Sequence, residues 1–514
     1  MKTKRQFLLN GLLLALVSLL MRTVSVSFNV YVSNIAGAQA MGLIALISGV
    51  YGFAITLATS GIHLATVRTI SARLEQTGGA ENGKCLRACL RYAFFFGSLS
   101  TVLLFLLARP LSVFAFRDTR TSRALYLLSF TLLPIALTSV LNGYFVAVRR
   151  AWKNALSQVS EQGVKILLTG YFLVFLAPES VEGCVLAILS GGAVAECFSL
   201  ILNLILYALD RRRFRNVRPL KSGLAPRVAD VALPVAISAY ARSGLLAIEH
   251  ILIPHGLLAF GADTSAALSA YGALQSMALP VILYPAAITG AFSGLLIPEI
   301  TEQQSANNRR EIRYIAWRVY QLTMLFAIGT SAVMLYFSAP LGQALYDSEQ
   351  VASFIRLLAP LIPIMYLDTA TDALLKGLGE QVYSMRVNIL DALVSVLCVA
   401  LLVPRMGIAG YLVTIYITEI LNAALSITRL LRVSGFAPGV RQLVLRPLLC
   451  AFGGIYSFHF FFQTLPLPLF AQILLVTAFY VLLLFLTGSF SGKDRKWLVE
   501  FLRHPRPAST CSKK

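Results

Sequence analysis

Long apolar segments constrain this chain more than any other feature. Runs of about 20 or more mostly apolar residues recur along all 514 residues, separated by short polar gaps. A helix of about 20 residues crosses the ~30 Å hydrocarbon core of a bilayer. With 57% hydrophobic and only 13% charged residues, a soluble fold of this size could not bury its apolar surface. The sequence therefore predicts an all-α polytopic membrane protein, because the runs are too long for the alternating strands of a barrel.

Fourteen segments are long enough to span the membrane. The first follows a basic start but exceeds the ~7–15 apolar residues of a signal peptide, so we expect it to stay as a transmembrane helix. The fourteen predicted spans lie at roughly 7–33, 40–66, 88–108, 122–148, 155–177, 183–208, 229–256, 266–297, 313–339, 352–377, 382–403, 407–431, 444–463 and 467–488.

The distribution of basic residues predicts the orientation of these spans. Lys and Arg concentrate at the N-terminus, in every second loop and in the C-terminal tail, whereas the opposite loops hold few, mainly Arg109, Arg117, Arg120 and Arg123. This positive-inside pattern places both termini in the cytoplasm. The basic stretch 209–228 fits an anchor to anionic headgroups. The net charge of +21 therefore indicates orientation in a membrane, and we expect no nucleic-acid partner.

The chain contains an internal repeat, in which three segments of the first half have matches in the second. Their residue numbers differ by 233, 230 and 229, and the order of the segments is kept. Such a period predicts two halves of six helices related by a pseudo-two-fold axis along the membrane normal. The matching pairs are SGIHLATVRTI (60–70) with SGLLIPEITEQ (293–303), ARPLSVFAF (108–116) with SAPLGQALY (338–346), and TLLPIALTSVLNG (131–143) with PLIPIMYLDTATD (360–372).

The repeat divides the chain into five predicted parts. They are an N-terminal six-helix lobe at 1–208, a basic cytoplasmic linker at 209–228, a C-terminal six-helix lobe at 229–431, two further helices at 432–488, and a basic cytoplasmic tail at 489–514.

Several charged residues lie inside the predicted spans. Each costs about 2.5–3.5 kcal/mol at the centre of a helix on insertion scales, so such residues face a protein interior or an aqueous cavity and mark functional paths. The basic ones are Arg22, Lys165, Arg242 and Arg356, and the acidic ones include Glu161, Glu196, Glu249, Asp368, Asp372, Asp391 and Glu419.

The first helices of the two halves share one pattern. Arg22 and Asn29 are seven residues apart in the first helix, and Arg242 and Glu249 are seven apart in the seventh. Residues at this spacing lie two turns apart on one helix face. Two near-symmetric guanidinium groups facing a shared cleft would form an anion site suited to phosphate. The alternative is that each arginine pairs with a nearby acid or with carbonyl groups at a helix end.

Other charged residues form shorter patterns. Glu161 and Lys165 are four residues apart, which favours an ion pair on one helix, although they could also take part in ion coupling. Asp368, Asp372 and Lys376 form a stripe along one helix face. This stripe either lines the cytoplasmic part of a cavity or belongs to a solvated helix end.

Three further residues are candidates by position. Arg68 follows the apolar part of the second span, where it faces a cavity or marks the cytoplasmic boundary. Pro280 and Pro285 interrupt the eighth span. Because proline breaks the helical hydrogen-bond ladder, they predict either a hinge or a static kink.

Three segments resemble those of a known superfamily. They are NIAGAQAMGLIALISGVYGFAITLATSGIHLATVRTIS (34–71), ARSGLLAIEHILIP (241–254) and ALLKGLGEQ (373–381). In these segments the chain resembles the multidrug/oligosaccharidyl-lipid/polysaccharide exporter superfamily, in the polysaccharide exporter branch that includes the stage V sporulation protein B group and is related to lipid II flippases.

The resemblance implies a flippase of the bacterial cytoplasmic membrane. Its substrate would be an undecaprenyl-linked saccharide, whose diphosphate is received by basic residues in a V-shaped cavity; Arg22 and Arg242 suit that role. Glu249 would contact a sugar or bind a coupling ion, H⁺ or Na⁺. No nucleophile-and-base constellation or metal-ligand spacing occurs in the sequence, so we expect neither an enzyme nor a cofactor. The alternatives are a cation-coupled multidrug antiporter of the same superfamily and a non-transporting scaffold.

Overall fold

The structure is a computed structural model that describes residues 2–77, 82–175, 180–211, 228–435, 439, 441–462 and 467–489. Most of the predicted linker 209–228 and tail 489–514 lies outside these residues. Helices form nearly all of the described part, which contains no strand. The helices are α1 (Lys2–Thr59), α2 (Ile62–Thr77), α3 (Asn82–Pro110), η1 (Leu111–Ala115), α4 (Thr121–Ser129), α5 (Leu132–Ala147), α6 (Ala151–Phe175), α7 (Val181–Arg211), α8 (Val228–Phe260), α9 (Thr264–Gly272), η3 (Ala273–Ala278), α10 (Leu279–Leu283), α11 (Ala286–Ser305), α12 (Arg309–Tyr336), α13 (Ser338–Tyr346), α14 (Glu349–Leu358), η4 (Ala359–Leu361), α15 (Ile362–Gly377), α16 (Gln381–Met406), α17 (Ile408–Ser434), η5 (Arg441–Leu445), α18 (Arg446–Phe462) and α19 (Leu469–Leu486).

These helices confirm the polytopic class. In the described part, eleven segments are long and apolar enough to cross a membrane, or twelve when α4 and α5, bent by 41°, count as one span. The first of the eleven, Leu19–Leu74, has 56 residues, which at 1.5 Å per residue is about 84 Å and far exceeds one bilayer core. Gly37, with φ of 79° and ψ of 166°, breaks α1. This break and the turn between α1 and α2 divide the segment into three helical parts.

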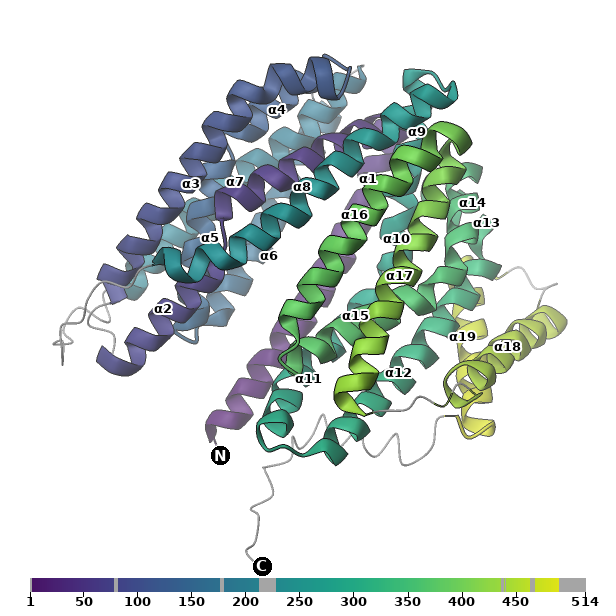
Figure 1. Cartoon of the computed structure of the whole chain (residues 1–514). Coiled ribbons are helices and arrows are strands. Elements are labelled where there is room, and N and C mark those ends of the chain that lie inside the picture. Colours follow the sequence, from purple (N-terminus) through teal and green to yellow (C-terminus); the bar gives the residue numbers. More distant parts are fainter. Residues whose placement is uncertain are drawn as a thin grey trace, which may run out of the picture.

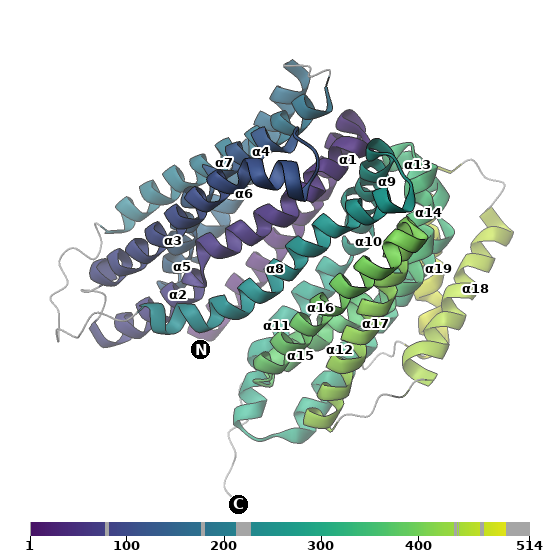
Figure 2. The same cartoon turned by 45° about the horizontal axis from the view of Figure 1, so that its top comes forward.

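The helices form two bundles (Figures 1 and 2). One contains α2 to α7 and the part of α1 after Gly37, and the other contains α9 to α17. The α18–α19 pair packs on the outer side of the second bundle, beside α12. The bundles meet at the end that holds α9, which we call the closed end. They diverge towards the end where the N-terminus lies, the splayed end.

The two halves repeat the same backbone turns. Arg117 and Asp347, whose residue numbers differ by 230, adopt φ angles of 51° and 48°. We call this difference of 230 the repeat offset. It also relates Arg149 to Gly379, which adopt φ angles of 58° and 78°. Positive φ is uncommon for residues other than glycine, so its recurrence at one offset shows that the internal repeat extends to the backbone.

An ion pair links the last two helices of each half. The helix that carries the basic residue in the first half carries the acidic residue in the second. In the first half, the amine of Lys153 lies 2.8 Å from the carboxylate of Asp210, whose side chain is 1% exposed. In the second half, Glu380 and Arg429 pair at 2.9 Å, with side chains 22% and 37% exposed. The basic residue lies at the start of α6 and the acidic one at the end of α7, whereas the acidic residue lies at the start of α16 and the basic one near the end of α17.

We expect Asp210→Asn to destabilise the protein more than Glu380→Gln. Asp210 is buried with Lys153 and Arg150 as ion-pair partners, so its loss leaves uncompensated buried charge and costs about 3–5 kcal/mol. The more exposed pair of Glu380 contributes about 1 kcal/mol or less. The thermal midpoint of each purified variant in detergent measures the difference. Equal midpoints would show that burial does not set the strength of these pairs.

Candidate functional site

Two helices lie at the boundary between the bundles. In α1, before Gly37, the side-chain amide of Asn29 donates to the backbone oxygen of Ser276 at 2.7 Å. In α8, the hydroxyl of Tyr240 forms a hydrogen bond with that of Ser60. Each first helix of one half therefore packs against the second helix of the other half, which places α1 and α8 along the axis between the bundles (Figure 2).

A pair of equivalent hydrogen bonds fixes the register of these helices. Asn34 donates to the backbone oxygen of Leu345 at 2.9 Å, and the ring of His255 bonds the backbone oxygen of Ala115 at 2.5 Å. The two acceptors are related by the repeat offset, whereas the residue numbers of the two side chains differ by only 221. The second half thus has nine more residues between its first and second helices.

By this register, Arg22 and Arg242 occupy nearly equivalent positions in the two halves. With the offset of 221, the equivalent of Arg22 is position 243, one residue from Arg242. Both arginines are exposed. One guanidinium nitrogen of Arg22 lies 3.4 Å from the backbone oxygen of Leu283, and Arg242 interacts electrostatically with Asp391. Each arginine thus has the kind of neighbour that the structural alternative predicted, yet neither is covered by protein.

Two glycines bring the halves into direct backbone contact at the closed end. A Cβ added to Gly42 would overlap the backbone oxygen of Leu268, and one added to Gly272 would overlap that of Ala38. The repeat offset relates Gly42 to Gly272, and it also relates Ala38 to Leu268. The contact is therefore symmetric about the pseudo-two-fold axis, and only a hydrogen atom fits at either position. We call these four residues the glycine seam.

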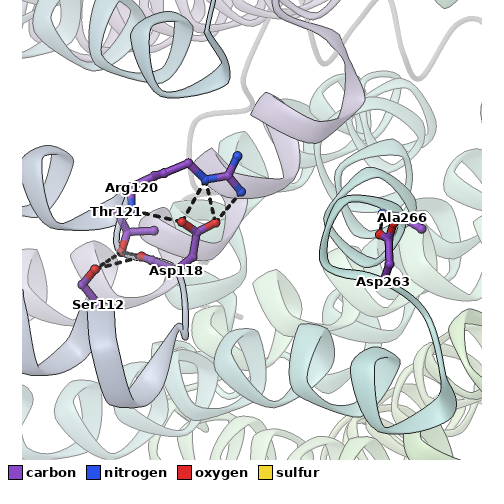
Figure 3. A network of polar contacts seen from close by, with 6 residues as sticks. All are labelled: Ser112, Asp118, Arg120, Thr121, Asp263 and Ala266. Atoms are coloured by element: carbon purple, nitrogen blue, oxygen red, sulfur yellow. Dashed lines mark hydrogen bonds and ion pairs between the residues drawn. The ribbon is translucent and has the colours of Figure 1, made fainter.

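Charged groups near the closed end are neutralised locally (Figure 3). Arg120 forms a forked pair with Asp118, with its Nε 2.9 and 3.0 Å from the two carboxylate oxygens. These hydrogen bonds raise the pKa of the Arg120 guanidinium. The hydroxyls of Ser112 and Thr121 both donate to the backbone oxygen of Asp118. Asp263 caps α9, and the backbone N–H that it accepts lowers the pKa of its carboxyl group.

Four carboxylates form a group where α8 packs against the second bundle. They come from four different helices, α8, α15, α16 and α17, and we call them the acidic cluster: Glu249, Asp368, Asp391 and Glu419. Asp391 interacts electrostatically with the other three. Burying several carboxylates near one another is costly unless positive charge or a proton offsets their repulsion, and Arg242 supplies one such charge beside Asp391.

Hydrogen bonds satisfy the acidic cluster only in part. Ser395 hydrogen-bonds to the carboxyl group of Glu249, and Asn422 donates to that of Asp368 at 3.2 Å. One buried oxygen of Asp368 and one of Asp391 have no hydrogen-bond partner. Buried polar atoms are normally paired, so these two retain the capacity to accept. Among the described residues, however, no group of three or more His, Cys, Asp or Glu side chains has the arrangement of a metal site.

The stripe predicted on the tenth span divides between two environments. Asp368 joins the acidic cluster. Asp372 instead pairs with Lys376 at 2.5 Å and accepts a hydrogen bond from Ser384. The stripe therefore contributes one residue to the cluster and one local ion pair.

The first bundle has a smaller counterpart of the acidic cluster. Glu161 is related to Asp391 by the repeat offset, and it interacts with Lys165 and Glu196. The same offset relates Lys165 to Ser395, so a cation in the first half replaces a hydroxyl in the second. Sequence reasoning recognised Asp391 and Glu419 as intramembrane acids but not as partners of Glu249. Applying the repeat offset to Glu161 would have singled out Asp391.

The remaining candidates are Arg68 and two prolines on either side of Leu283, the residue that Arg22 contacts. Arg68 is exposed on α2. Pro280 lies in the first turn of α10, and Pro285 precedes α11. The predicted eighth span is accordingly divided into α9, η3, α10 and α11, which agrees with a break at the prolines and leaves the choice between hinge and static kink untested.

The fold and these groups define a class of protein. Two related helical bundles, joined at one end and carrying charged residues in their membrane-spanning helices, are typical of a secondary transporter. A family model described as "Polysaccharide biosynthesis protein" matches residues 7–287, and a second, "MatE", matches 258–402. The chain belongs to the polysaccharide biosynthesis protein family. It is therefore an exporter of the superfamily suggested by its sequence, and a multi-pass protein of the bacterial cytoplasmic membrane.

Relatives and solved structures agree with this membership. The chain is 25% identical to "Stage V sporulation protein B" of Bacillus subtilis (strain 168) over 84% of this chain and 85% of that protein. Its fold is similar to that of "Lipid II flippase MurJ, inward closed conformation", with a TM-score of 0.68 and 12% identity over 95% and 100% of the two chains. It is also similar to an inward-facing MATE family multidrug transporter, with a TM-score of 0.62 and 16% identity over 81% and 96%.

Proposed function

We propose that this protein moves an undecaprenyl-linked saccharide across the cytoplasmic membrane by alternating access. The chain would cross the membrane fourteen times with both termini in the cytoplasm. In that orientation the splayed end faces the cytoplasm, and the glycine seam closes the opposite side. The lobe boundaries at 208 and 229 follow from the repeat. A polyprenyl tail is stable in lipid, so only the polar headgroup needs a protected path.

The near-equivalence of Arg22 and Arg242 in the two halves is what most directly supports this proposal. They extend from the two helices that lie between the bundles, and both are exposed. Guanidinium groups bind phosphate oxygens through two parallel hydrogen bonds. Two of them at nearly equivalent positions would receive the diphosphate of the substrate, with Asn29 and Arg68 as further polar groups along its path.

We assign the acidic cluster to ion coupling. Glu249 lies on α8, the helix that also carries Arg242, so its occupancy by H⁺ or Na⁺ would act on the helix that receives the substrate. In the first bundle, Glu161 would take the place of the acidic cluster. Because Lys165 already neutralises it, Glu161 would respond less to the coupling ion. A rearrangement of α10 and α11 about Pro280 and Pro285 would allow the second bundle to move together with α8.

We expect Glu249→Gln to uncouple transport from the cation gradient. The amide keeps the size of the side chain and removes the charge that would attract the ion. Proteoliposomes with an imposed H⁺ or Na⁺ gradient should show transport that no longer responds to the gradient. Glu302→Gln, an exposed change on α11, serves as the matched control. A normal gradient response in Glu249→Gln would remove this residue from coupling.

Reconstitution with defined substrates tests the function itself. The purified protein is placed in liposomes with fluorescent undecaprenyl-linked saccharides, and the fraction that becomes accessible on the opposite leaflet is measured. We expect translocation of at least one polyprenyl-diphosphate saccharide and none of free cationic drugs.

Drug transport is the second candidate, because the "MatE" model matches residues 258–402 and the acidic cluster would suit a cationic substrate. Drug uptake without movement of any lipid-linked saccharide would favour that antiporter function. Movement of neither class, by protein that reconstitutes in folded form, would favour a non-transporting role.

A further inference from the structure

A pocket lies outside the boundary between the bundles, where the α18–α19 pair meets α12. It encloses about 260 Å³, which is below the ~300–1,000 Å³ typical of drug-sized ligands. It could therefore hold only part of a larger molecule. The lining residues come from α12, from η5 and the first residue of α18, and from the residues just after α19: Tyr314, Trp317, Arg318, Gln321, Gln442, Arg446, Gly488 and Ser489.

The lining chemistry favours an anion. Two of the lining side chains, Arg318 and Arg446, are guanidinium groups, and none of the lining residues is acidic. Gln321, Gln442 and Trp317 add neutral N–H donors. Charge-assisted hydrogen bonds from arginine to phosphate are among the strongest that side chains form.

Contacts within the pocket hold one of these arginines in place. A guanidinium nitrogen of Arg318 lies 3.2 Å from the side-chain oxygen of Gln321, and the guanidinium lies 5.1 Å from the ring centre of Tyr314. The amide of Gln321 in turn donates to the backbone oxygen of Ser489 at 3.0 Å. The end of α19 is thereby joined to α12, and Arg318 is oriented before any ligand binds.

The position of the pocket identifies the source of the anion. α12 begins at Arg309, α18 begins at Arg446 and α19 ends at Leu486, so the pocket lies where three membrane-spanning helices reach the membrane surface. Trp and Tyr are enriched at headgroup depth, and basic pockets between transmembrane helices bind anionic lipid headgroups. A phosphate held in a bilayer by its own acyl chains is present here at high local concentration.

We propose that this pocket binds the phosphate of an anionic phospholipid and thereby fastens the α18–α19 pair to α12. The site is separate from Arg22 and Arg242, and it does not depend on the identity of the transported molecule. A transporter of any substrate could carry it.

Native mass spectrometry of the full-length protein in a neutral detergent tests the proposal. The probes are phosphatidylglycerol, phosphatidylcholine and inorganic phosphate. We expect tight retention of one phosphatidylglycerol, no comparable retention of phosphatidylcholine, and no displacement by millimolar inorganic phosphate. Arg446→Gln should weaken retention by at least about fivefold. Arg313→Gln, an exposed change on the same face of the membrane, should leave it unchanged, and Arg446→Lys should preserve part of it.

Three results would overturn the proposal. Equal retention by Arg446→Gln and Arg313→Gln would place the lipid elsewhere. Equal retention of the two phospholipids would show that the headgroup charge is not recognised, and displacement by inorganic phosphate would assign the pocket to a free anion. The lipid-free thermal midpoints of the variants show whether the change in binding comes from loss of folding.

Discussion

Replacing Gly42 with alanine should prevent the bundles from meeting as they do in this structure and abolish transport. The new Cβ would overlap the backbone oxygen of Leu268, with the backbone nitrogen of Gly272 3.2 Å away. Backbone atoms cannot move aside as a flexible side chain can, so the halves must separate. Overpacking of this kind costs about 1–3 kcal/mol or more, which shifts a two-state equilibrium roughly 10- to 100-fold away from the closed seam.

The matched control is Gly52→Ala in the same helix. Nothing lies within 4 Å of a Cβ at Gly52, so this variant should behave as the wild type. Spin labels at Phe114→Cys and Ala344→Cys, exposed positions at the closed end that the repeat offset relates, report the separation in a background without native cysteines. We expect a longer label distance in Gly42→Ala alone. An unchanged distance with normal transport would show that the seam tolerates a methyl group.

We expect Arg242→Ala to reduce transport strongly while the protein still reaches the membrane. Arg242 is exposed, so little packing is lost, whereas a hydrogen bond to a charged group is worth about 1.5–3 kcal/mol. Its loss predicts a decrease in transport of roughly 10- to 100-fold. Growth of a flippase-depleted strain and translocation in proteoliposomes both measure the effect.

Two control variants separate charge from geometry. Arg242→Lys keeps the charge but loses the planar fork, so we expect partial activity. Arg405→Ala removes an exposed arginine from the end of α16 and should leave transport unchanged. Full growth of the Arg242→Ala strain would exclude this arginine from substrate binding, and the diphosphate assignment would then lose one of its two cations.

The closed end also shows where sequence reasoning stopped. The repeat was visible in the sequence, and the shared seven-residue pattern paired Arg22 with Arg242, although the offset near 230 alone would relate Arg22 to about position 252. Only the hydrogen bonds of Asn34 and His255 show that the first helices are related by the smaller offset of 221. The extra residues are shared between the end of α8, the turn at 261–263 and the start of α9, so they merge with the apolar runs on either side and leave no separate signal in the sequence.

The acidic cluster could be predicted only residue by residue. Each acid stood out because a charge inside an apolar run is costly. That the four acids come together could not be predicted, since it depends on how α8, α15, α16 and α17 rotate about their axes and pack together. The same holds for the glycine seam, because Gly42 and Gly272 look like other glycines until their backbones are seen in contact.

The polytopic helical class, the internal repeat and the charges within apolar runs could all be predicted from the sequence alone. Those properties follow from solvation, which acts on each residue according to its own side chain and the length of the run around it. The three-dimensional packing was needed to show which helices lie between the bundles, which acids come together and where the halves touch. Those properties depend on packing between distant segments, which a one-dimensional pattern of polarity does not encode.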